Sequence, residues 1–217
     1  SRSDHGQALL ADLRTGTAER RELTLADGSR LSLNAGSAVN LDFSPGQRLL
    51  YLHQGSLVIQ VTADATRPLV VRTAQGDARA LGTRFLVRQE AQQSLALVLE
   101  HAVELRVTRP GVPALRLAQG QAARFDGERI TREAPDGAAS FAAAWSRGMF
   151  EALDTPLGEV VDALRHYRRG LIRVAPEAAR LRAAGAFPLD DVDAALTALA
   201  ETMPIQVHRH AANWLVR

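Results

Sequence analysis

Cysteine is absent from this 217-residue chain, and aromatic residues make up only 5% of it. Without cysteine the chain has no disulfide, no thiol nucleophile and no thiolate metal ligand. Lysine is absent as well, so every basic residue is an arginine. The low aromatic content leaves few rings for the surface once a core is filled, which argues against a sugar-binding platform.

The chain also lacks a strong excess of charge of one sign, since its formal net charge is +2. Nucleic-acid-binding proteins usually carry a basic stripe interleaved with aromatic residues. Here the arginines are scattered at single positions, and the only clusters are Arg20–Arg21 and Arg165 to Arg169. We therefore expect no nucleic-acid partner.

Long hydrophobic runs are missing too. A membrane helix needs about 20 apolar residues, no window of this chain approaches that length, and residues 1–16 lack the apolar core of a signal peptide. We expect the chain to be soluble as given, with any membrane anchor outside it. A content of 46% apolar and 23% charged residues is typical of a globular protein with one or two domains.

From residue 17 to residue 125 the sequence alternates apolar and polar residues, as half-buried strands do. The runs include RLSLN, RLLYL, SLVIQV, PLVVRT, RFLVR, LALVL and VELRV. Short turn-like breaks separate them, at 25–29, 52–56, 73–77, 99–103 and 117–121. Such a degenerate repeat predicts an all-β domain that is a hairpin stack, a roll or a β-solenoid. The turns alone do not decide among these, because strand pairing depends on register.

The pattern changes after Phe125. Residues 126–144 begin as a polar, Pro- and Gly-containing connection, and residues 145–217 predict a smaller α+β module. One helix follows Thr155, the predicted N-cap, and Pro156, and it ends at Gly170. A second helix follows Asp190 as N-cap and stops before Pro204.

The predicted strands of this module are one within FAAAWSRGMFEAL before the first helix, 171–174, the AGAFPLD segment, IQVHRH (205–210) and NWLVR (213–217). The order strand, helix, strand, strand, helix, strand, strand predicts a small split βαβ arrangement in which two helices cover one face of a sheet. Trp145 is predicted to be a core residue where the two halves of the chain join, and Trp214 a core residue of the sheet.

Catalytic and metal-binding motifs are not found. The six histidines lie in no known catalytic or phosphate-binding motif. His208 and His210 would share one strand face, but they lack a third ligand and are better explained as a polar edge-strand face. Asp190, Asp191 and Asp193 are explained by capping and the helix dipole. We therefore expect no cofactor, no metal and no multiple-turnover enzyme activity.

Several segments together resemble the periplasmic region of the FecR family, the inner-membrane anti-sigma regulators of cell-surface signalling in iron uptake. The matching text is TAERRELTLADGSRLSLNAGS, RLLYLHQG, RPLVVRT, ALGTRFLVR, LAQGQ and AWSRGMFEALDTPLGEVVDALRHYRRGLI, which spans most of the chain from Thr17 onward. The resemblance implies that residues 1–16 are a flexible membrane-proximal segment and that residues 17–125 form the FecR-like β domain. It also implies that 145–217 resembles the STN module, which the partner receptors carry as their signalling domain.

The resemblance further implies a periplasmic signal-receiving role within a single-pass inner-membrane protein. The implied partners are the signalling domain of a TonB-dependent outer-membrane receptor and, through a cytoplasmic part outside this sequence, an extracytoplasmic-function sigma factor. Membrane contact would be made only by a transmembrane helix outside the sequence. A carbohydrate- or polymer-binding β-roll of the envelope is the alternative function.

Two surfaces are candidates for receptor binding. Terminal strands expose unpaired backbone groups that can add to another sheet, and the edge residues expected there are Ile205, Val207, His208 and Leu215. The rival surface is the outer face of the helix over 156–168, including Arg165 and the adjacent Arg169.

The Gly82–Thr83 pair in ALGTRFLVR has two explanations. Some FecR-like regulators split at a Gly-Thr bond in this motif by an N-to-O acyl shift, in which the threonine hydroxyl attacks the preceding carbonyl. The leading explanation is structural, because glycine permits a tight bend before a strand and a β-branched threonine starts one well.

Overall fold

The computed structural model describes residues 11–133, 144–210 and 213–217. The chain forms two compact units. Unit 1 comprises Ser1–Gly16 and Arg20–Ser140, and unit 2 comprises Thr17–Glu19 and Phe141–Arg217. None of the helices in the described ranges is long and apolar enough to cross a membrane.

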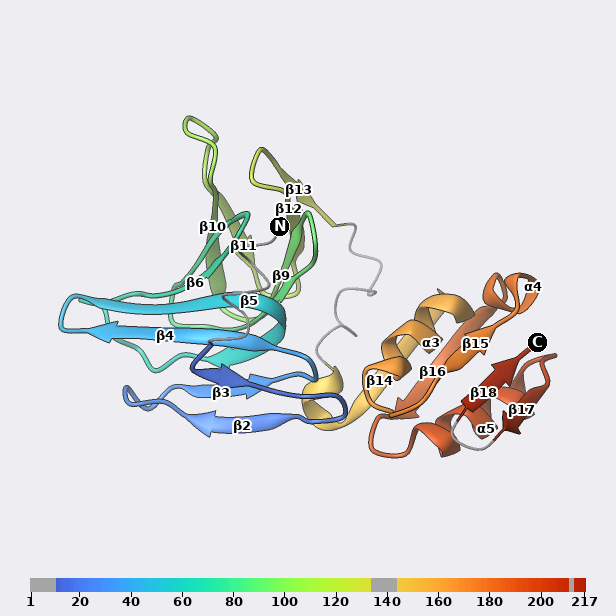
Figure 1. Ribbon diagram of the computed structural model, residues 1–217. Coiled ribbons are helices and arrows are strands. Elements are labelled where there is room, and N and C mark those ends of the chain that lie inside the picture. The colour runs from blue at the N-terminus through green and yellow to red at the C-terminus, as the bar shows by residue number, and fades with distance from the viewer. Residues whose placement is uncertain (1–10, 134–143, 211–212) are drawn as a thin grey trace. The chain divides into compact units, whose positions relative to one another are not determined.

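Unit 1 is a single 13-stranded sheet (Figure 1). Its strands are β1 (Leu13–Arg14), β2 (Arg21–Thr24), β3 (Arg30–Leu33), β4 (Ala38–Ser44), β5 (Gln47–Gln60), β6 (Leu69–Thr73), β7 (Gly76–Ala80), β8 (Arg84–Gln89), β9 (Ser94–Glu100), β10 (Ala102–Val107), β11 (Leu115–Ala118), β12 (Ala122–Phe125) and β13 (Ile130–Arg132). The main path runs β11-β10-β7-β6-β5-β8-β9-β12-β13. Off this path, β3 and β4 each pair with β5, β2 pairs with β3, and β1 pairs with β4.

The long strand β5 joins the two halves of this sheet. Its first half pairs with β4 and, in parallel, with β6, while its second half pairs with β3 and β8. Side chains from both halves meet in one core, as the alternating runs predict: Leu69 and Val71 of β6 pack in the same cluster as Phe85 and Val87 of β8. β11, at one end of the path, also contacts β9 near the other end. Unit 1 is therefore a nearly closed roll of mainly antiparallel strands, and the solenoid alternative is not observed.

Gly55 lies where β5 passes from one half of the sheet to the other. Its backbone has a φ of +84°, and a Cβ added there would lie 2.4 Å from Ser37 Oγ and 2.7 Å from Ser37 Cα. The Ser37 hydroxyl donates to the Ser56 carbonyl at 3.0 Å and accepts from the Ser56 N–H at 3.1 Å. Only glycine fits this close approach of two strands without strain.

Arg48, at the start of β5, is buried and ties two loops together, the one between β2 and β3 and the one between β5 and β6. Its Nε donates to the Arg67 carbonyl at 2.7 Å, and its Nη1 donates to Asp27 Oδ2 at 2.8 Å and to the Thr62 carbonyl at 3.0 Å. Burial alone would raise the pKa of Asp27, but hydrogen bonds from Ser29 and Arg48 outweigh it and lower that pKa below its ordinary value. The carboxylate is therefore held in its charged form inside the unit.

The β unit extends beyond residues 17–125 on both sides. Leu13 pairs with Val39, and the Thr15 N–H donates to the Ser37 carbonyl at 3.0 Å, so the predicted flexible segment 1–16 contributes a strand. β13 lies within the predicted connection 126–144 and pairs with β12. Residues 1–10 and 134–143 lie outside the described residues. Short strands such as these carry too few residues for periodicity to reveal them.

Unit 2 has the predicted order of elements (Figure 1). After the 3₁₀ turn η1 (Ala144–Arg147) come β14 (Met149–Pro156), α3 (Leu157–Arg165), β15 (Ile172–Val174), α4 (Pro176–Ala179), β16 (Arg182–Pro188), α5 (Val192–Thr202), β17 (Val207–His210) and β18 (Asn213–Val216). The short helix α4 was not predicted. Trp145 is buried, as predicted, with 5% of its surface exposed.

The strands of unit 2 form two small sheets, β14-β16 and β15-β18-β17, where the sequence had predicted one. α3 contacts β14, β15 and β16, and α5 contacts β16 and β17, so each helix spans both sheets. The buried stripe of α3 is Leu157, Val160, Val161 and Leu164, as its spacing predicts.

The start of each long helix differs from the prediction. α3 begins at Leu157 with Pro156 at the N-cap position and no side-chain cap, because Thr155 belongs to β14 and its hydroxyl bonds to Leu153 instead. α5 is capped by Asp191 and not by Asp190: Asp191 Oδ1 accepts from the Ala194 N–H at 2.9 Å. This is the usual hydrogen bond of an N-cap to the third helical residue.

Candidate partner-binding site

The histidine and aspartate clusters of unit 2 do not assemble a metal site in the part of the chain that the structure describes. There, no three His, Asp or Glu side chains come together in a way that could hold a metal ion. Asp191 caps α5, and Asp193 pairs with Arg168 at 2.7 Å. His208 lies on β17, and the side chain of His210 is outside the described residues.

β17 is an edge strand of the β15-β18-β17 sheet, since the described strands pair with it only on its β18 side. The direction in which each backbone N–H and C=O group of β17 points follows from the hydrogen bonds between β17 and β18. Gln206 and Arg217 exchange both hydrogen bonds, at 2.6 and 3.0 Å. Hydrogen-bonded and non-bonded pairs alternate along an antiparallel ladder, and Arg209 is opposite Trp214, three residues along from the Gln206–Arg217 pair. The backbone N–H and C=O groups of Val207 and Arg209 therefore face the open edge.

The other residues predicted at the edge lie elsewhere. β18 is not an edge: it is the central strand, antiparallel to β17 and parallel to β15, so Leu215 lies on a strand that is paired on both sides. Ile205 is buried with 9% of its surface exposed, and it precedes β17. The reason for the difference is that the last strand along the chain is inserted between two earlier ones, which chain order does not reveal. Val207 and His208 do lie on the edge strand.

On the rival surface, Arg165 and Arg169 lie near the C-terminal end of α3 and have different roles. Arg165 donates to the Ile172 carbonyl from Nε at 2.9 Å and from Nη2 at 2.6 Å, and it also pairs with Asp162. These bonds tie the helix end to the start of β15. Arg169 is exposed, and its carbonyl accepts from Arg168 Nη1 at 3.1 Å.

Beside the β17 edge lies a cluster of four side chains, which we call the Trp214 cluster: Arg168 from the loop after α3, Asp193 from α5, Arg209 from β17 and Trp214 from β18. Asp193 Oδ1 accepts from Arg168 Nε at 2.7 Å and from Trp214 Nε1 at 3.1 Å. Arg209 Nη1 lies 3.5 Å from Asp193 Oδ2. Each guanidinium carbon is 5.8 Å from the centre of the Trp214 ring, within the range of a cation–π interaction.

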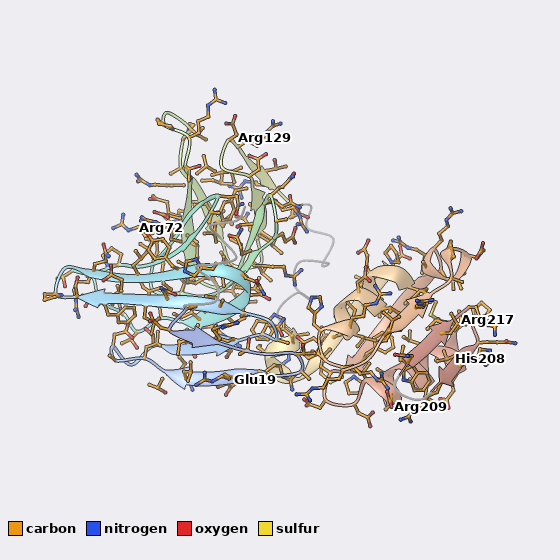
Figure 2. The ribbon with its side chains drawn as sticks, in the orientation of Figure 1. Glu19, Arg72, Arg129, His208, Arg209 and Arg217 are labelled. Atoms are coloured by element: carbon orange, nitrogen blue, oxygen red, sulfur yellow. The ribbon has the colours of Figure 1, made fainter. Side chains whose placement is uncertain are left out.

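The electrostatics of the Trp214 cluster keep Asp193 ionised. The hydrogen bond from Arg168 is the largest influence and lowers the pKa of Asp193; the charges of Arg168 and Arg209 and the Trp214 hydrogen bond act in the same direction, against partial burial. Arg168 has only 12% of its side chain exposed, whereas Arg209 has 59% exposed. Arg209, labelled in Figure 2, is therefore the more solvent-exposed arginine of the cluster.

Sequence reasoning did not find this cluster. Trp214 was predicted to be sheet core, but it is half-buried and lies against two arginines. Asp193 was explained by the helix dipole alone. No local pattern joins Arg168 to Trp214, because only the parallel pairing of β15 with β18 brings the end of α3 to the last strand.

The Gly82–Thr83 pair forms a corner between β7 and β8 in unit 1. Gly82 has a φ of +69°, and a Cβ added there would meet nothing within 4 Å. Thr83 is buried with 3% of its surface exposed, its hydroxyl donates to the Glu100 carbonyl, and its own carbonyl accepts from the Val61 N–H at 3.0 Å. The arrangement holds Thr83, the residue that precedes β8, on both sides, which is what a sheet corner requires.

Comparisons with known proteins agree with this architecture. The sequence model of the FecR family, described as FecR protein, matches residues 11–104. Two crystal structures of a candidate anti-sigma factor from Parabacteroides distasonis ATCC 8503, at 2.50 and 1.65 Å resolution, superpose with a TM-score of 0.76 and 24% identity. They cover 94% of this chain and 96% and 97% of their own. No curated protein matches the chain.

Proposed function

Because residues 11–104 match the FecR family, we propose that this chain is the signal-receiving part of a regulator of a sigma factor. The match and the likeness of fold to a candidate anti-sigma factor support a regulatory role in sigma-factor signalling. In this proposal the chain is periplasmic, belongs to a single-pass inner-membrane protein, and binds the signalling domain of a TonB-dependent outer-membrane receptor during iron uptake. The extracytoplasmic-function sigma factor is contacted by a cytoplasmic part outside this sequence.

The open edge of β17 is the observation that carries the receptor-binding part of the proposal. Two successive outward-facing residues, Val207 and Arg209, offer backbone donors and acceptors at spacing two, the arrangement that accepts an added strand. The addition of a strand is a binding event that requires no catalysis, in keeping with the expectation that the chain has no multiple-turnover enzyme activity. We also propose that Gly82–Thr83 serves as a corner and not as a bond that cuts itself.

The alternative of a carbohydrate-binding roll has less support. In the described ranges the exposed large hydrophobic side chains are Leu81, Leu153 and Leu171, and none of these is aromatic. A sugar platform requires exposed rings. Tyr51 and His53, whose ring centres are 6.1 Å apart, are half-buried.

The proposal is tested by measuring binding of the purified chain to the signalling domain of a TonB-dependent receptor from the same organism, by calorimetry. Val207→Pro removes an outward-facing N–H and leaves the ladder to β18 intact, so we expect Kd to rise about tenfold or more, the loss of one hydrogen bond plus the clash of the ring. Circular dichroism checks that the variant is folded.

Arg169→Glu is the matched test of the rival helix surface. It is preferred to a reversal at Arg165, since Arg165 holds the Ile172 carbonyl and its loss would disturb the fold. We expect Arg169→Glu to leave Kd within about twofold. Unchanged binding by Val207→Pro together with weakened binding by Arg169→Glu would transfer the interface to α3, and no binding by the wild type would remove the receptor from the proposal.

A further inference from the structure

The sheet that contains β17 carries charge of one sign. β15, β17, β18 and Arg217, which follows β18, contribute the side chains of Arg173, Arg209 and Arg217 and no Asp or Glu side chain. His208, Arg209 and Arg217 are labelled at this end of unit 2 in Figure 2. The carboxylate that lies against this sheet in the Trp214 cluster, Asp193, comes from α5.

Asp193 is shared by both arginines of the Trp214 cluster. Its Oδ1 takes hydrogen bonds from the mostly buried Arg168 and from Trp214, at 2.7 and 3.1 Å. Arg209 approaches the other oxygen at 3.5 Å, beyond the usual length of a charge-assisted hydrogen bond. Of the two guanidinium groups, that of Arg209 is the more exposed, with 59% of the side chain open against 12% for Arg168, so it is the one that an added strand can reach.

Arg209 is also one of the two residues whose backbone faces the open edge. The residue of an added strand that pairs with Arg209 would have its side chain on the same face of the sheet, about 5 Å away at Cβ. Opposite charges in such a cross-strand pair are stabilising and like charges are destabilising. The backbone of Arg209 can therefore pair with an added strand, and its side chain can discriminate the charge of the residue paired with it.

We propose that the Trp214 cluster makes the β17 edge selective for a strand that places Asp or Glu opposite Arg209. In this arrangement Arg168 and Asp193 position the Trp214 ring, the ring supports the Arg209 guanidinium, and Arg209 receives the partner's carboxylate. The inference rests on the proposed docking of a strand at β17 and adds to it the chemistry of the partner, an acidic extended segment.

The test uses two capped nine-residue peptides of alternating threonine and valine, identical except for Glu or Lys at the central position. Amide chemical shifts of the isotope-labelled full chain are followed during titration. We expect shifts centred on Val207 and Arg209, with Kd about fivefold lower for the Glu peptide, and we expect this ratio to shrink in 0.5 M NaCl through screening (on the order of a 4–5 Å Debye length).

Two variants distinguish an effect of Arg209 itself from an effect of the net charge of the protein. In Arg209→Gln we expect the ratio of the two Kd values to fall below about two, whereas Arg173→Gln, an exposed arginine on the opposite edge strand, should keep the wild-type ratio. The inference is overturned if neither peptide shifts the β17 amides, if both bind equally, if the preference survives in Arg209→Gln, or if Arg173→Gln abolishes it equally.

These results are distinguishable from failure of the proposed function. If the receptor domain binds and Val207→Pro weakens it, but the peptides show no preference that depends on Arg209, the proposed function stands and this inference falls. If the Glu preference is present but no receptor signalling domain binds, the acidic-strand site stands and the receptor must be replaced by another partner.

Discussion

Replacing Arg48 with methionine should destabilise unit 1 more than any exposed arginine could. The side chains of Arg48 and Asp27 are 3% and 8% exposed, and Arg48 satisfies two carbonyls and one carboxylate. Methionine keeps much of the length of the side chain and removes every donor. Breaking a buried pair from one side costs about 3–5 kcal/mol, because the remaining charge is left without compensation. That is a large part of the roughly 5–15 kcal/mol by which domains are stable.

The free energy of unfolding is measured in urea by far-UV circular dichroism, which follows the sheet of unit 1 together with the helices and strands of unit 2. Both tryptophans belong to unit 2, so fluorescence follows that unit separately. Arg106→Met is the control: that side chain is 64% exposed and also pairs with a carboxylate, so its loss should cost less than about 1 kcal/mol. The reasoning is refuted if the two variants lose the same stability.

Acid should reveal the same ion pair. The folded-state pKa of Asp27 lies below the ordinary value of 3.8, so its contribution is present above that pH and is lost as pH falls through the folded-state value. The stability difference between wild type and Arg48→Met should therefore narrow below about pH 4. Adding Asp27→Asn to Arg48→Met should recover about half of the loss at neutral pH, because the uncompensated charge is removed.

Three further outcomes are expected. Gly55→Ala places a side chain at a left-handed backbone position and against Ser37, so the free energy of unfolding of unit 1, measured by thermal denaturation, should fall by about 2 kcal/mol or more. An unchanged midpoint temperature would contradict the close approach of Gly55 to Ser37. Asp191→Ala should cost unit 2 about 1 kcal/mol, measured by urea unfolding with fluorescence, through loss of the N-cap; a matching loss in Asp190→Ala would contradict that assignment. The purified wild type and Thr83→Ala should each give one intact band in gel electrophoresis, whereas two fragments in the wild type alone would show self-cleavage.

The strands of unit 1 could be predicted from the sequence because buried and more exposed positions alternate along strands such as β6. Leu69 and Val71 point into the core and the residues between them do not, so a period of two is visible without any partner strand. Turn chemistry was readable for a similar local reason: Gly28, Gly120 and His101 all have positive φ at the predicted breaks. Helices α3 and α5 were recognised from their apolar stripes.

Pairing was not readable, because it joins segments that carry no shared local signal. The parallel pair of β5 with β6 and the central place of β18 depend on register between distant residues, and the turn predicted at 52–56 is a bend at Gly55 inside the single strand β5. The candidate site could be predicted only in part for the same reason. Val207 was placed on the edge correctly, Leu215 was not, and the Trp214 cluster exists only once β18 is inserted between its neighbours.

The insertion of β18 also sets an order of events during synthesis. β15 and β17 both leave the ribosome before β18, yet neither pairs with the other, and each is held in the sheet through β18 alone. Until residues 213–216 emerge, the Arg209 edge has no strand behind it and Trp214 is missing from its cluster. A nascent or C-terminally clipped chain would thus carry the roll of unit 1 without a paired β17, and the partner site proposed at β17 would form only once residues 213–216 are in place.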